Sequence, residues 1–204
     1  MSGIEPKEGM ITFNAEGTEG GLFHSRKLHV PTLSSGLTLG RGYDLRFKTK
    51  NEVTLDLTKI GLEKEQINQL SSATGLAGQQ AKEFISEHKL ESFELSPQQQ
   101  VKLFEISYQK EQLETKRLCT KPDVERAYGR CDWSNLNKGI KEVLVDMKFR
   151  GDYTPIVRKK IQKTISDNNT KGFYGVLDKR ENWPNVPVDR FKRRVEYFKK
   201  LNNL

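Results

Sequence analysis

Cysteine and long apolar runs are both scarce in this sequence. It contains two cysteines, Cys119 and Cys131, and no run of the roughly 18 apolar residues that a membrane helix needs. No further cysteine or histidine stands at the spacing of a zinc site, and two cysteines do not make a disulfide framework. Their separation permits one bridge, but spacing does not establish disulfide geometry, so we expect two free thiols. We also expect no membrane insertion.

Several motifs of well-understood chemistry are missing as well. The chain has no phosphate-binding Gly-x-x-x-x-Gly-Lys loop, no His-Glu-x-x-His zinc motif and no Gly-x-Ser-x-Gly nucleophile elbow. Residues 36–42 superficially resemble a nucleotide-binding glycine loop, but the Gly-x-Gly at 40–42 lacks the third glycine of Gly-x-Gly-x-x-Gly, because position 45 is Leu. His24 and His29 have no third ligand beside them, so hydrogen bonding or packing is their expected role. We expect no metal and no cofactor.

Negative charge is in deficit, because 27 Asp and Glu face 35 Lys and Arg in 204 residues and leave a net charge of +8. Such a field favours polyanionic partners, such as nucleic acid, an anionic membrane or a bacterial wall that carries carboxylates. The apolar share is only 34%, yet ten Phe, six Tyr and two Trp argue against disorder. Residues 1–6 lack the pattern of a secretion signal, so we expect synthesis in the cytoplasm and any export by another route.

Glycine is concentrated in the first 50 residues, where it separates short apolar runs. This pattern is typical of loops and short strands rather than helices. From about residue 54 onward the apolar spacing is helical. The sequence predicts a single domain over residues 1–204, with a small glycine-rich, β-containing lobe at about 10–60 and a larger helical lobe at about 61–204. The expected fold class is α+β, mostly α.

Capping signals and apolar spacing place several helices. Residues 96–99 (SPQQ) combine a serine cap, a proline in the first turn and the glutamine of a capping box, and predict a helix that ends near Arg117. Residues 136–149 carry apolar side chains on one face and predict a central core helix that ends at Gly151. The spacing also predicts helices from Thr154, from Val188 and over residues 77–89, while residues 53–57 fit either a strand or a helix.

Carboxylates and a hydroxyl gather in the glycine-rich segment, namely those of Glu16, Glu19, Asp44 and Thr38. A carboxylate pair is the minimum for glycoside hydrolysis, in which one group protonates the leaving oxygen and the other serves a water or the sugar. Solvated surface carboxylates are the alternative interpretation, since most Asp and Glu side chains lie in water. Composition alone therefore allows a glycosidase without establishing one.

Three segments carry a resemblance to a known family: residues 18–21 (TEGG), 29–31 (HVP) and 35–45 (SGLTLGRGYDL). They resemble the pesticin-type toxins, which are muramidases whose catalytic domain is similar to phage-type lysozyme. The motif of that family is a Glu-Gly pair, a variable loop that often ends in aromatic-Val-Pro, and Ser-Gly-Val-Thr-Ile-Gly-x-Gly-aromatic-Asp-Leu. The last part matches nearly position for position. Residues 145–151 and 188–196 are more loosely similar to the central helix and the arginine-rich closing helix of that fold.

The resemblance implies a lysozyme-like fold and a peptidoglycan hydrolase that cleaves the β-1,4 bond between N-acetylmuramic acid and N-acetylglucosamine without a cofactor. It implies that the glutamate of the Glu-Gly pair is the general acid, that Asp44 is the second carboxylate and that Thr38 helps to hold the attacking water. Both Glu16 and Glu19 precede a glycine and fit the pair. We favour Glu19, because the double glycine that follows it occurs in many relatives.

The implied roles set opposite electrostatic requirements. The general acid must stay protonated near neutral pH, so burial or a nearby negative charge must raise its pKa. Asp44 must remain ionised, and Arg41 or Arg46 is the expected nearby cation. Whether the reaction inverts or retains the anomeric configuration depends on the separation of the carboxylates, which a sequence does not give.

The resemblance also implies a biological setting. It points to an antibacterial toxin or effector delivered to the periplasm and cell wall of a target, or to a bacteriolytic phage endolysin, acting in either case without a classical signal peptide. The expected partners are peptidoglycan and an immunity or delivery protein, and no nucleic acid. The substrate is expected in a cleft between the two lobes.

Alternative functions follow from the same residues. One is a non-catalytic protein that binds the cell wall, or that binds nucleic acid through a basic helix face made of Arg190, Lys192, Arg193, Arg194, Lys199 and Lys200. No recognition-helix signature accompanies this face, so a solvated surface is the expected interpretation. Another is a lytic transglycosylase, which uses a single acid and forms an anhydro-sugar, if Asp44 is structural.

Overall fold

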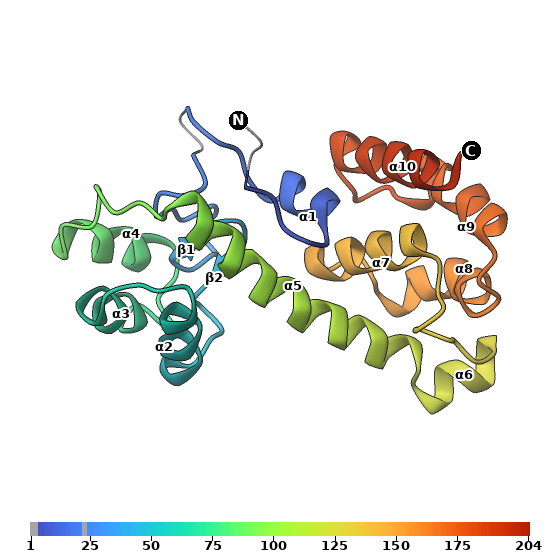
Figure 1. The fold of residues 1–204 in the computed structure, drawn as a ribbon, viewed down its shortest axis with the longest axis horizontal. Helices are drawn as coiled ribbons and strands as arrows, with labels where there is room; N and C mark the ends of the chain where they lie inside the picture. The colour runs from blue at the N-terminus through green and yellow to red at the C-terminus, as the bar shows by residue number, and fades with distance from the viewer. Residues whose placement is uncertain (1–3, 22–23) are drawn as a thin grey trace. The chain divides into compact units, whose positions relative to one another are not determined.

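The structure is a computed structural model that describes residues 4–21 and 24–204 (Figure 1). Over these residues the chain is mostly helical, with ten α-helices and one small antiparallel sheet of two strands. No helix in the described part of the chain is both long and apolar enough to cross a membrane. The predicted mostly helical class with a small β element is confirmed. Residues 1–3, which belong to the segment without a secretion-signal pattern, lie outside the described residues.

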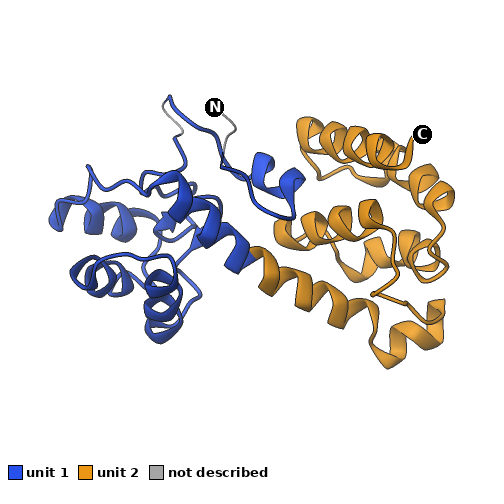
Figure 2. Cartoon of the chain, in the orientation of Figure 1, with its two compact units in different colours: residues 1–107 blue, residues 108–204 orange. Residues whose placement is uncertain are grey.

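The chain divides into two compact units, residues 1–107 and residues 108–204 (Figure 2). The division falls inside the long helix α5 (Pro97–Cys119), whose first half belongs to the first unit and whose second half belongs to the second. The lobe boundary expected at about residue 60 lies within the first unit, between α2 (Lys50–Lys59) and α3 (Lys64–Ser71), which pack against each other.

The first unit is built around the small sheet. Besides α2, α3 and the start of α5, it contains α1 (Met10–Ala15), β1 (Thr38–Leu39), β2 (Tyr43–Asp44) and α4 (Gly78–Glu87). Leu37, Leu39 and Leu45 are fully buried and belong to one apolar core with Val53 and Leu57 of α2. The glycine-rich segment is therefore anchored by its leucines, which fixes the backbone that carries the predicted site residues.

Helix α1 contradicts the expectation that the first 50 residues contain no helix. Its residues Ile11, Thr12 and Phe13 are buried, and the ring of Phe13 packs edge-on against Phe104 of α5, with ring centroids 5.0 Å apart. A helix of six residues makes fewer than two turns, so the sequence holds too few apolar positions to show helical spacing. Packing, rather than local preference, supports this helix.

The ambiguous residues 53–57 form part of helix α2. The hydroxyl of Thr49 accepts a hydrogen bond from the backbone N–H of Glu52 at 3.2 Å and so caps the helix, and Val53 and Leu57 are buried one turn apart. The helix predicted over 77–89 is confirmed as α4. The capping box at residues 96–99 is confirmed at the start of α5, where Ser96 and Gln99 exchange hydrogen bonds of 2.9 and 3.1 Å.

Besides the second half of α5, the second unit contains five α-helices, and α7 (Lys138–Arg150) forms its core. The other four are α6 (Pro122–Tyr128), α8 (Pro155–Ser166), α9 (Thr170–Leu177) and α10 (Val188–Asn202), and a short 3-10 helix spans Arg180–Asn182. Ile140, Val143, Leu144 and Met147 are fully buried, and Gly151 ends α7 in the left-handed conformation at φ 92°. The predicted core helix and its glycine end are confirmed.

A buried ion pair joins α7 to α10. Asp146 is 0% exposed, and its two carboxylate oxygens bind Arg190 Nη2 and Arg194 Nε, each at 2.7 Å. Burial raises the pKa of Asp146, but the charges and hydrogen bonds of Arg194 and Arg190 outweigh it and hold the pKa below its usual value. Both arginines are buried, so the interpretation of α10 as one continuous basic face is wrong at these two positions.

Candidate active site

The two strands bring two of the predicted site residues together. In the antiparallel register Thr38 lies opposite Asp44, and Leu39 lies opposite Tyr43. Directly opposite residues project to the same face of a sheet, so Thr38 and Asp44 share one face. Leu39 and Tyr43 share the other face and are buried in the core. The apolar face of this hairpin therefore sets the orientation of the polar one.

The carboxylate of Asp44 closes the loop that leads into β1. The N–H of Gly36 donates to both carboxylate oxygens at 3.1 Å, and the N–H of Arg46 donates to Oδ1 at 2.8 Å. A Cβ on Gly36 would lie 2.5 Å from Oδ1, so only glycine fits there. A carboxylate has about four acceptor positions, so this one keeps capacity for a water or a sugar hydroxyl.

Thr38 is a buried residue, only 2% exposed. Its hydroxyl donates a hydrogen bond to the carbonyl oxygen of Gly36 at 3.2 Å. The backbone of Thr38 is paired a second time, with His29, through bonds of 2.8 and 3.2 Å. Since the hydroxyl proton is used, the lone pairs of Thr38 Oγ1 are what the site offers to a water.

The carboxylate of Glu19 is bound by three side chains. Gln100 Nε2 donates to Oε1 at 2.6 Å, Arg26 Nε donates to Oε2 at 2.9 Å, and Arg41 Nη2 lies 3.4 Å from Oε1. The side chain is nevertheless 49% exposed. Glu19 is thus oriented by its neighbours and still open to a ligand.

Opposing effects act on the pKa of Glu19. Burial is the largest single effect and raises the pKa, whereas hydrogen bonds from Arg26 and Gln100, the charge of Arg26 and a hydrogen bond from Arg41 lower it. The lowering effects together prevail, so the pKa lies below its ordinary value of 4.5. At neutral pH the free protein holds Glu19 ionised, whereas a general acid must be protonated.

Arg41 links Glu19 to the turn of the hairpin. Its guanidinium lies 3.8 Å from the ring centroid of Phe13 and donates to the carbonyl oxygens of Phe13 and Gly17 at 2.5 and 2.7 Å. The expectation that its charge pairs with Asp44 is wrong, because its carboxylate partner is Glu19. The hydrogen bonds to Asp44 come from the backbone N–H groups of Gly36 and Arg46. A search of the sequence for nearby cationic side chains does not find such donors.

Glu16, the alternative acid, is half-buried at the end of α1, where its backbone N–H donates to the carbonyl of Thr12 at 3.0 Å. Glu19, by contrast, pairs with Arg41 in the turn of the hairpin.

His24 and Glu94 extend the network around Glu19. The N–H of Gly20 donates to His24 Nδ1 at 2.7 Å, so Nδ1 carries no proton and Nε2 donates to Glu94 Oε1 at 3.0 Å. Arg26 Nη1 also lies 2.5 Å from Glu94 Oε1. The expected hydrogen-bonding role of His24 is confirmed, while Arg26 and Glu94 were not expected here. Among the described residues, no three metal-ligating side chains form a cluster that could hold an ion.

Gln100 is the functional candidate that sequence reasoning missed most clearly. It is 2% exposed, and its Oε1 accepts a hydrogen bond from the hydroxyl of Ser25 at 2.7 Å, which leaves Nε2 to bind Glu19. It lies 81 positions after Glu19, so nothing local connects the two. The available signal was a polar residue on the apolar face of a predicted helix, because Gln100 shares that face with Leu103 and Phe104.

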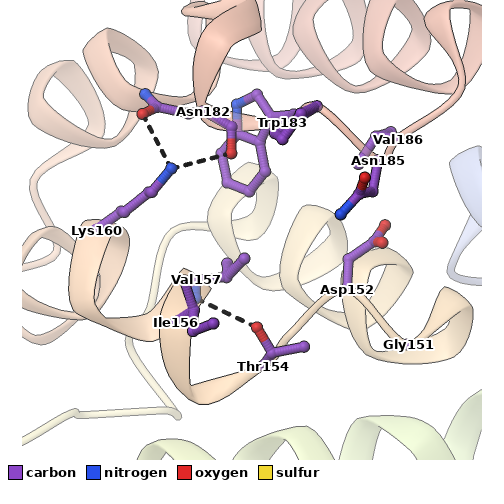
Figure 3. Close-up of a pocket in the computed structure, with 11 residues that line it drawn as sticks. Gly151, Asp152, Thr154, Ile156, Val157, Lys160, Asn182, Trp183, Asn185 and Val186 are labelled. Atoms are coloured by element: carbon purple, nitrogen blue, oxygen red, sulfur yellow. Dashed lines mark hydrogen bonds between the residues drawn. The ribbon is translucent and has the colours of Figure 1, made fainter.

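A surface pocket of about 380 Å³ lies in the second unit and contains none of the predicted site residues (Figure 3). Its Lys160 ammonium binds the backbone and side-chain oxygens of Asn182 at 3.2 and 3.3 Å. Its Asp152 carboxylate is paired with Arg194 at 2.8 Å, and the Trp183 ring in its wall is 3% exposed. Because these groups already bind other residues of the second unit, they are not available to bind a ligand in the pocket.

A comparison with known families covers most of the chain. The family described as a domain of unknown function (DUF8812) matches residues 9–195. The chain belongs to this family. The match runs from just before α1 into α10, so the DUF8812 domain includes the hairpin, the Glu19 loop and the core of the second unit. No curated protein matches the sequence. The family description assigns no activity.

Proposed function

We propose that the protein is a lysozyme-like muramidase, a glycoside hydrolase that cleaves the β-1,4 bond between N-acetylmuramic acid and N-acetylglucosamine in bacterial peptidoglycan. One observation carries the proposal. Thr38 and Asp44 lie opposite each other in one hairpin, and Arg41 in the turn of that hairpin contacts Glu19 at 3.4 Å. A carboxylate and a hydroxyl on the hairpin, with a second carboxylate joined to its turn through Arg41, are groups that glycoside hydrolysis uses.

In this proposal Asp44 and Thr38 bind the water that attacks the sugar, and Asp44 accepts its proton. The oxygen of Thr38 accepts one hydrogen of a water, and the remaining acceptor capacity of Asp44 takes the other. The water then attacks the anomeric carbon as its proton passes to Asp44, which gives inversion. Direct attack by Asp44 on the sugar is the alternative and gives retention. The anomer formed first distinguishes the two.

Glu19 serves the leaving group, and its environment explains how it acquires a proton. Burial is already the largest single effect on its pKa and raises it, even with the side chain 49% exposed. A bound glycan covers the carboxylate further and weakens the solvent access that keeps it charged, so the pKa rises on binding. Arg26 also pairs with Glu94, so it lowers the pKa of Glu19 less than it would with Glu19 as its single partner. Protonated Glu19 then donates to the glycosidic oxygen.

The charge of the chain suits the proposed substrate. A net charge of +8 attracts the protein to a wall rich in peptide carboxylates, which raises the encounter rate without adding specificity. As an antibacterial toxin or effector, or as an endolysin, the protein would reach the periplasm of a target cell by delivery. An immunity or delivery protein would be its second partner.

The test is digestion of isolated peptidoglycan by the full chain. We expect loss of turbidity and release of new reducing ends, with Asp44→Asn slower by at least about 10²-fold at unchanged melting temperature. Asp178→Asn, which removes a carboxylate from the exposed end of α9, is the matched control and keeps full activity.

Other products would contradict the proposal in distinct ways. Free amino groups would indicate an amidase or peptidase, and an anhydro-sugar end would indicate a lytic transglycosylase. Pelleting with peptidoglycan without any bond cleavage would indicate a wall-binding protein. Salt-sensitive binding to DNA in place of wall binding would favour a nucleic-acid-binding protein.

A further inference from the structure

The side chain of Arg46 differs from those of the other two arginines in the first unit, Arg26 and Arg41. Arg26 and Arg41 are paired with Glu19 at 2.9 and 3.4 Å. Within residues 4–21 and 24–204, the guanidinium of Arg46 forms no ion pair with a carboxylate. Its link to Asp44 runs through the backbone N–H instead, which donates to Oδ1 at 2.8 Å. The positive charge of Arg46 is therefore left for a ligand.

The guanidinium of Arg46 is held on two sides. Its Nη1 donates to the carbonyl oxygen of Ser34, and its central carbon lies 4.7 Å from the centroid of the Phe47 ring. The residue as a whole is half-buried. A guanidinium carries several N–H donors in a rigid fork that matches a carboxylate, and the bond to Ser34 leaves others for a second acceptor. Arg46 is thus oriented before any ligand arrives.

The loop that carries Ser34 is fixed to the start of α4. The N–H of Gly78 donates to the carbonyl oxygen of Ser35 at 2.9 Å, which holds the loop against the helix. From this loop the contacts continue through Ser34 to Arg46, and from the backbone of Arg46 to Asp44. The fold therefore sets the position of the guanidinium relative to the carboxylate that we assign to the reaction.

Exposed apolar side chains lie beside Arg46 in the chain and beside its partner Ser34. Phe47 is 85% exposed, and Leu33 is 80% exposed. The guanidinium covers one face of the Phe47 ring, and the other face is open to solvent. A cation between apolar groups suits a ligand that joins an apolar surface to an acid. A sugar ring with an acidic substituent, such as muramic acid, is a ligand of this kind.

The first unit has no general attraction for acids. Residues 1–107 contain 12 Lys and Arg against 14 Asp and Glu, so the positive charge of the chain resides in residues 108–204. A distant surplus of charge is screened by salt and raises the encounter rate without selecting a substrate. Selection of an acidic sugar at the hairpin therefore requires a cation beside the site, and Arg46 is such a cation.

We propose that Arg46 is a specificity-determining residue that binds a carboxylate of the substrate, so that the site prefers a glycan with acidic substituents to a neutral one. The inference rests on the proposed function, because it takes Asp44 as the position of the reacting sugar. In peptidoglycan this carboxylate belongs either to the lactyl group of muramic acid or to the peptide attached to that group. The fork of Arg46 binds it by charge-assisted hydrogen bonds.

The test compares glycan strands that differ only in their acids. One preparation keeps its peptides, and a second has lost them to an amidase and exposes the lactyl carboxylates. A portion of each is coupled through its carboxylates to a neutral amine. The rate of reducing-end release by the full chain gives KM and kcat. We expect KM to be roughly tenfold lower for an acidic preparation than for its neutralised form. The effect in the second preparation assigns the lactyl group, and an effect in the first alone assigns the peptide.

Variants of Arg46 show whether this residue causes the preference. Arg46→Gln should raise KM for the acidic glycan roughly tenfold, with little change in kcat and none in KM for the neutralised glycan. Arg46→Lys keeps the charge without the fork and should lie between the two. It also decides the question if Arg46→Gln does not fold. Arg126→Gln, which removes an exposed guanidinium from α6, is the matched control and should keep the wild-type preference.

A purely structural role of Arg46 would have a different result. Arg46→Gln would then lower the melting temperature and raise KM for the acidic and neutralised glycans alike. That result would overturn the inference, as would a wild-type chain that cleaves both forms equally well. The proposed function would stand in either case.

Equilibrium binding of the same glycans, measured by calorimetry in the cold, separates this inference from the proposed function. Absence of cleavage in every preparation would refute the proposed function. Tighter binding of the acidic glycan, lost in Arg46→Gln, would still support the role of Arg46. Equal binding of the two forms, or no binding of either, would overturn it.

Discussion

Gln100 Nε2 lies 2.6 Å from Glu19 Oε1, and this hydrogen bond joins α5 to the loop that follows α1. Gln100 is 2% exposed and its amide oxygen is held by Ser25, so it presents a fixed donor to a carboxylate that solvent can reach. A ligand that approaches Glu19 therefore meets an oriented group. Holding a group both near a ligand and in a fixed orientation reduces the entropy that binding must otherwise overcome.

The first prediction separates the two candidate acids. Glu19→Gln removes the transferable proton and should slow peptidoglycan cleavage by roughly 10²–10⁴-fold while wall binding persists. Glu16→Gln should have a milder effect, and Thr38→Ala should fall between Glu16→Gln and Asp44→Asn. The measurement is the initial rate of reducing-end release, with the melting temperature of each variant as control.

Loss of activity in Glu16→Gln alone would move the acid to Glu16, and full activity in both glutamate variants and in Asp44→Asn would contradict the mechanism.

The second prediction concerns pH. Arg26 lowers the pKa of Glu19, so Arg26→Gln should raise that pKa. A general acid works only when protonated, and activity fails as the pH rises through its pKa. The alkaline limb of kcat/KM should therefore move to higher pH in Arg26→Gln. Lys27→Gln, which changes an exposed neighbour, should leave the limb in place. A limb that moves to lower pH would exclude Glu19 as the titrating acid.

The third prediction assigns a substrate contact. Phe47 is 85% exposed, and its ring lies 4.7 Å from the guanidinium of Arg46, whose backbone N–H binds Asp44. An exposed ring next to the proposed site would offer an apolar face to a sugar. Phe47→Ala should raise KM roughly five- to tenfold with little change in kcat or stability, and Phe47→Tyr should restore it. An unchanged KM would place the glycan elsewhere.

The fourth prediction concerns the buried ion pair of the second unit. Asp146→Asn removes the carboxylate that Arg190 and Arg194 share, leaves Arg194 with Asp152, and should cost about 3–5 kcal/mol of unfolding free energy. The pKa of Asp146 is lowered on folding, so its contribution is full above the unfolded value of about 3.9 and is lost as the pH falls through the folded pKa. Urea unfolding at a series of acidic pH values should show this loss in the wild type and less of it in Asp146→Asn. Equal stability of the two chains at neutral pH would contradict it.

The fifth prediction tests the centre of the second unit. Leu144 is 0% exposed on α7, and Leu113 on α5 is 67% exposed. Leu144→Ala should lower the unfolding free energy by about 2–5 kcal/mol, and Ile140→Ala by a similar amount. Leu113→Ala should change it by less than about 0.5 kcal/mol. A melting temperature unmoved by Leu144→Ala would show that α7 is not the core.

Helices with clear local signals could be predicted, and the others could not. The serine cap at residue 96, the apolar face of α7 and Gly151 all act through near neighbours in the sequence. Helix α9 was missed because Gly172 and Gly175 lower its helix propensity, and its start depends on a cap by Asn169. Helix α6 has only seven residues, too few to show a periodic face.

Part of the candidate site could be predicted, because the residues of that part are close to one another in the sequence. Thr38, Asp44 and their glycines form a compact motif, and the sheet that joins them spans a few residues. The pairing of Arg41 with Glu19 and the donor role of Gln100 depend on tertiary contacts, which no local pattern contains. The environment of Glu19, and with it the direction of its pKa, therefore had to come from the structure.

The contact between Gly36 and Asp44 bears on how descendants of this chain would diverge. A side chain at position 36 would meet Asp44 Oδ1 at 2.5 Å and the Arg46 nitrogen at 2.7 Å, so the glycine and the aspartate eight positions later are retained or lost as a unit. Selection for folding alone would preserve this spacing whether or not a lineage has the proposed activity. Glu19 lies outside that constraint, so its replacement beside an intact Gly36 and Asp44 would mark a lineage without the proposed activity.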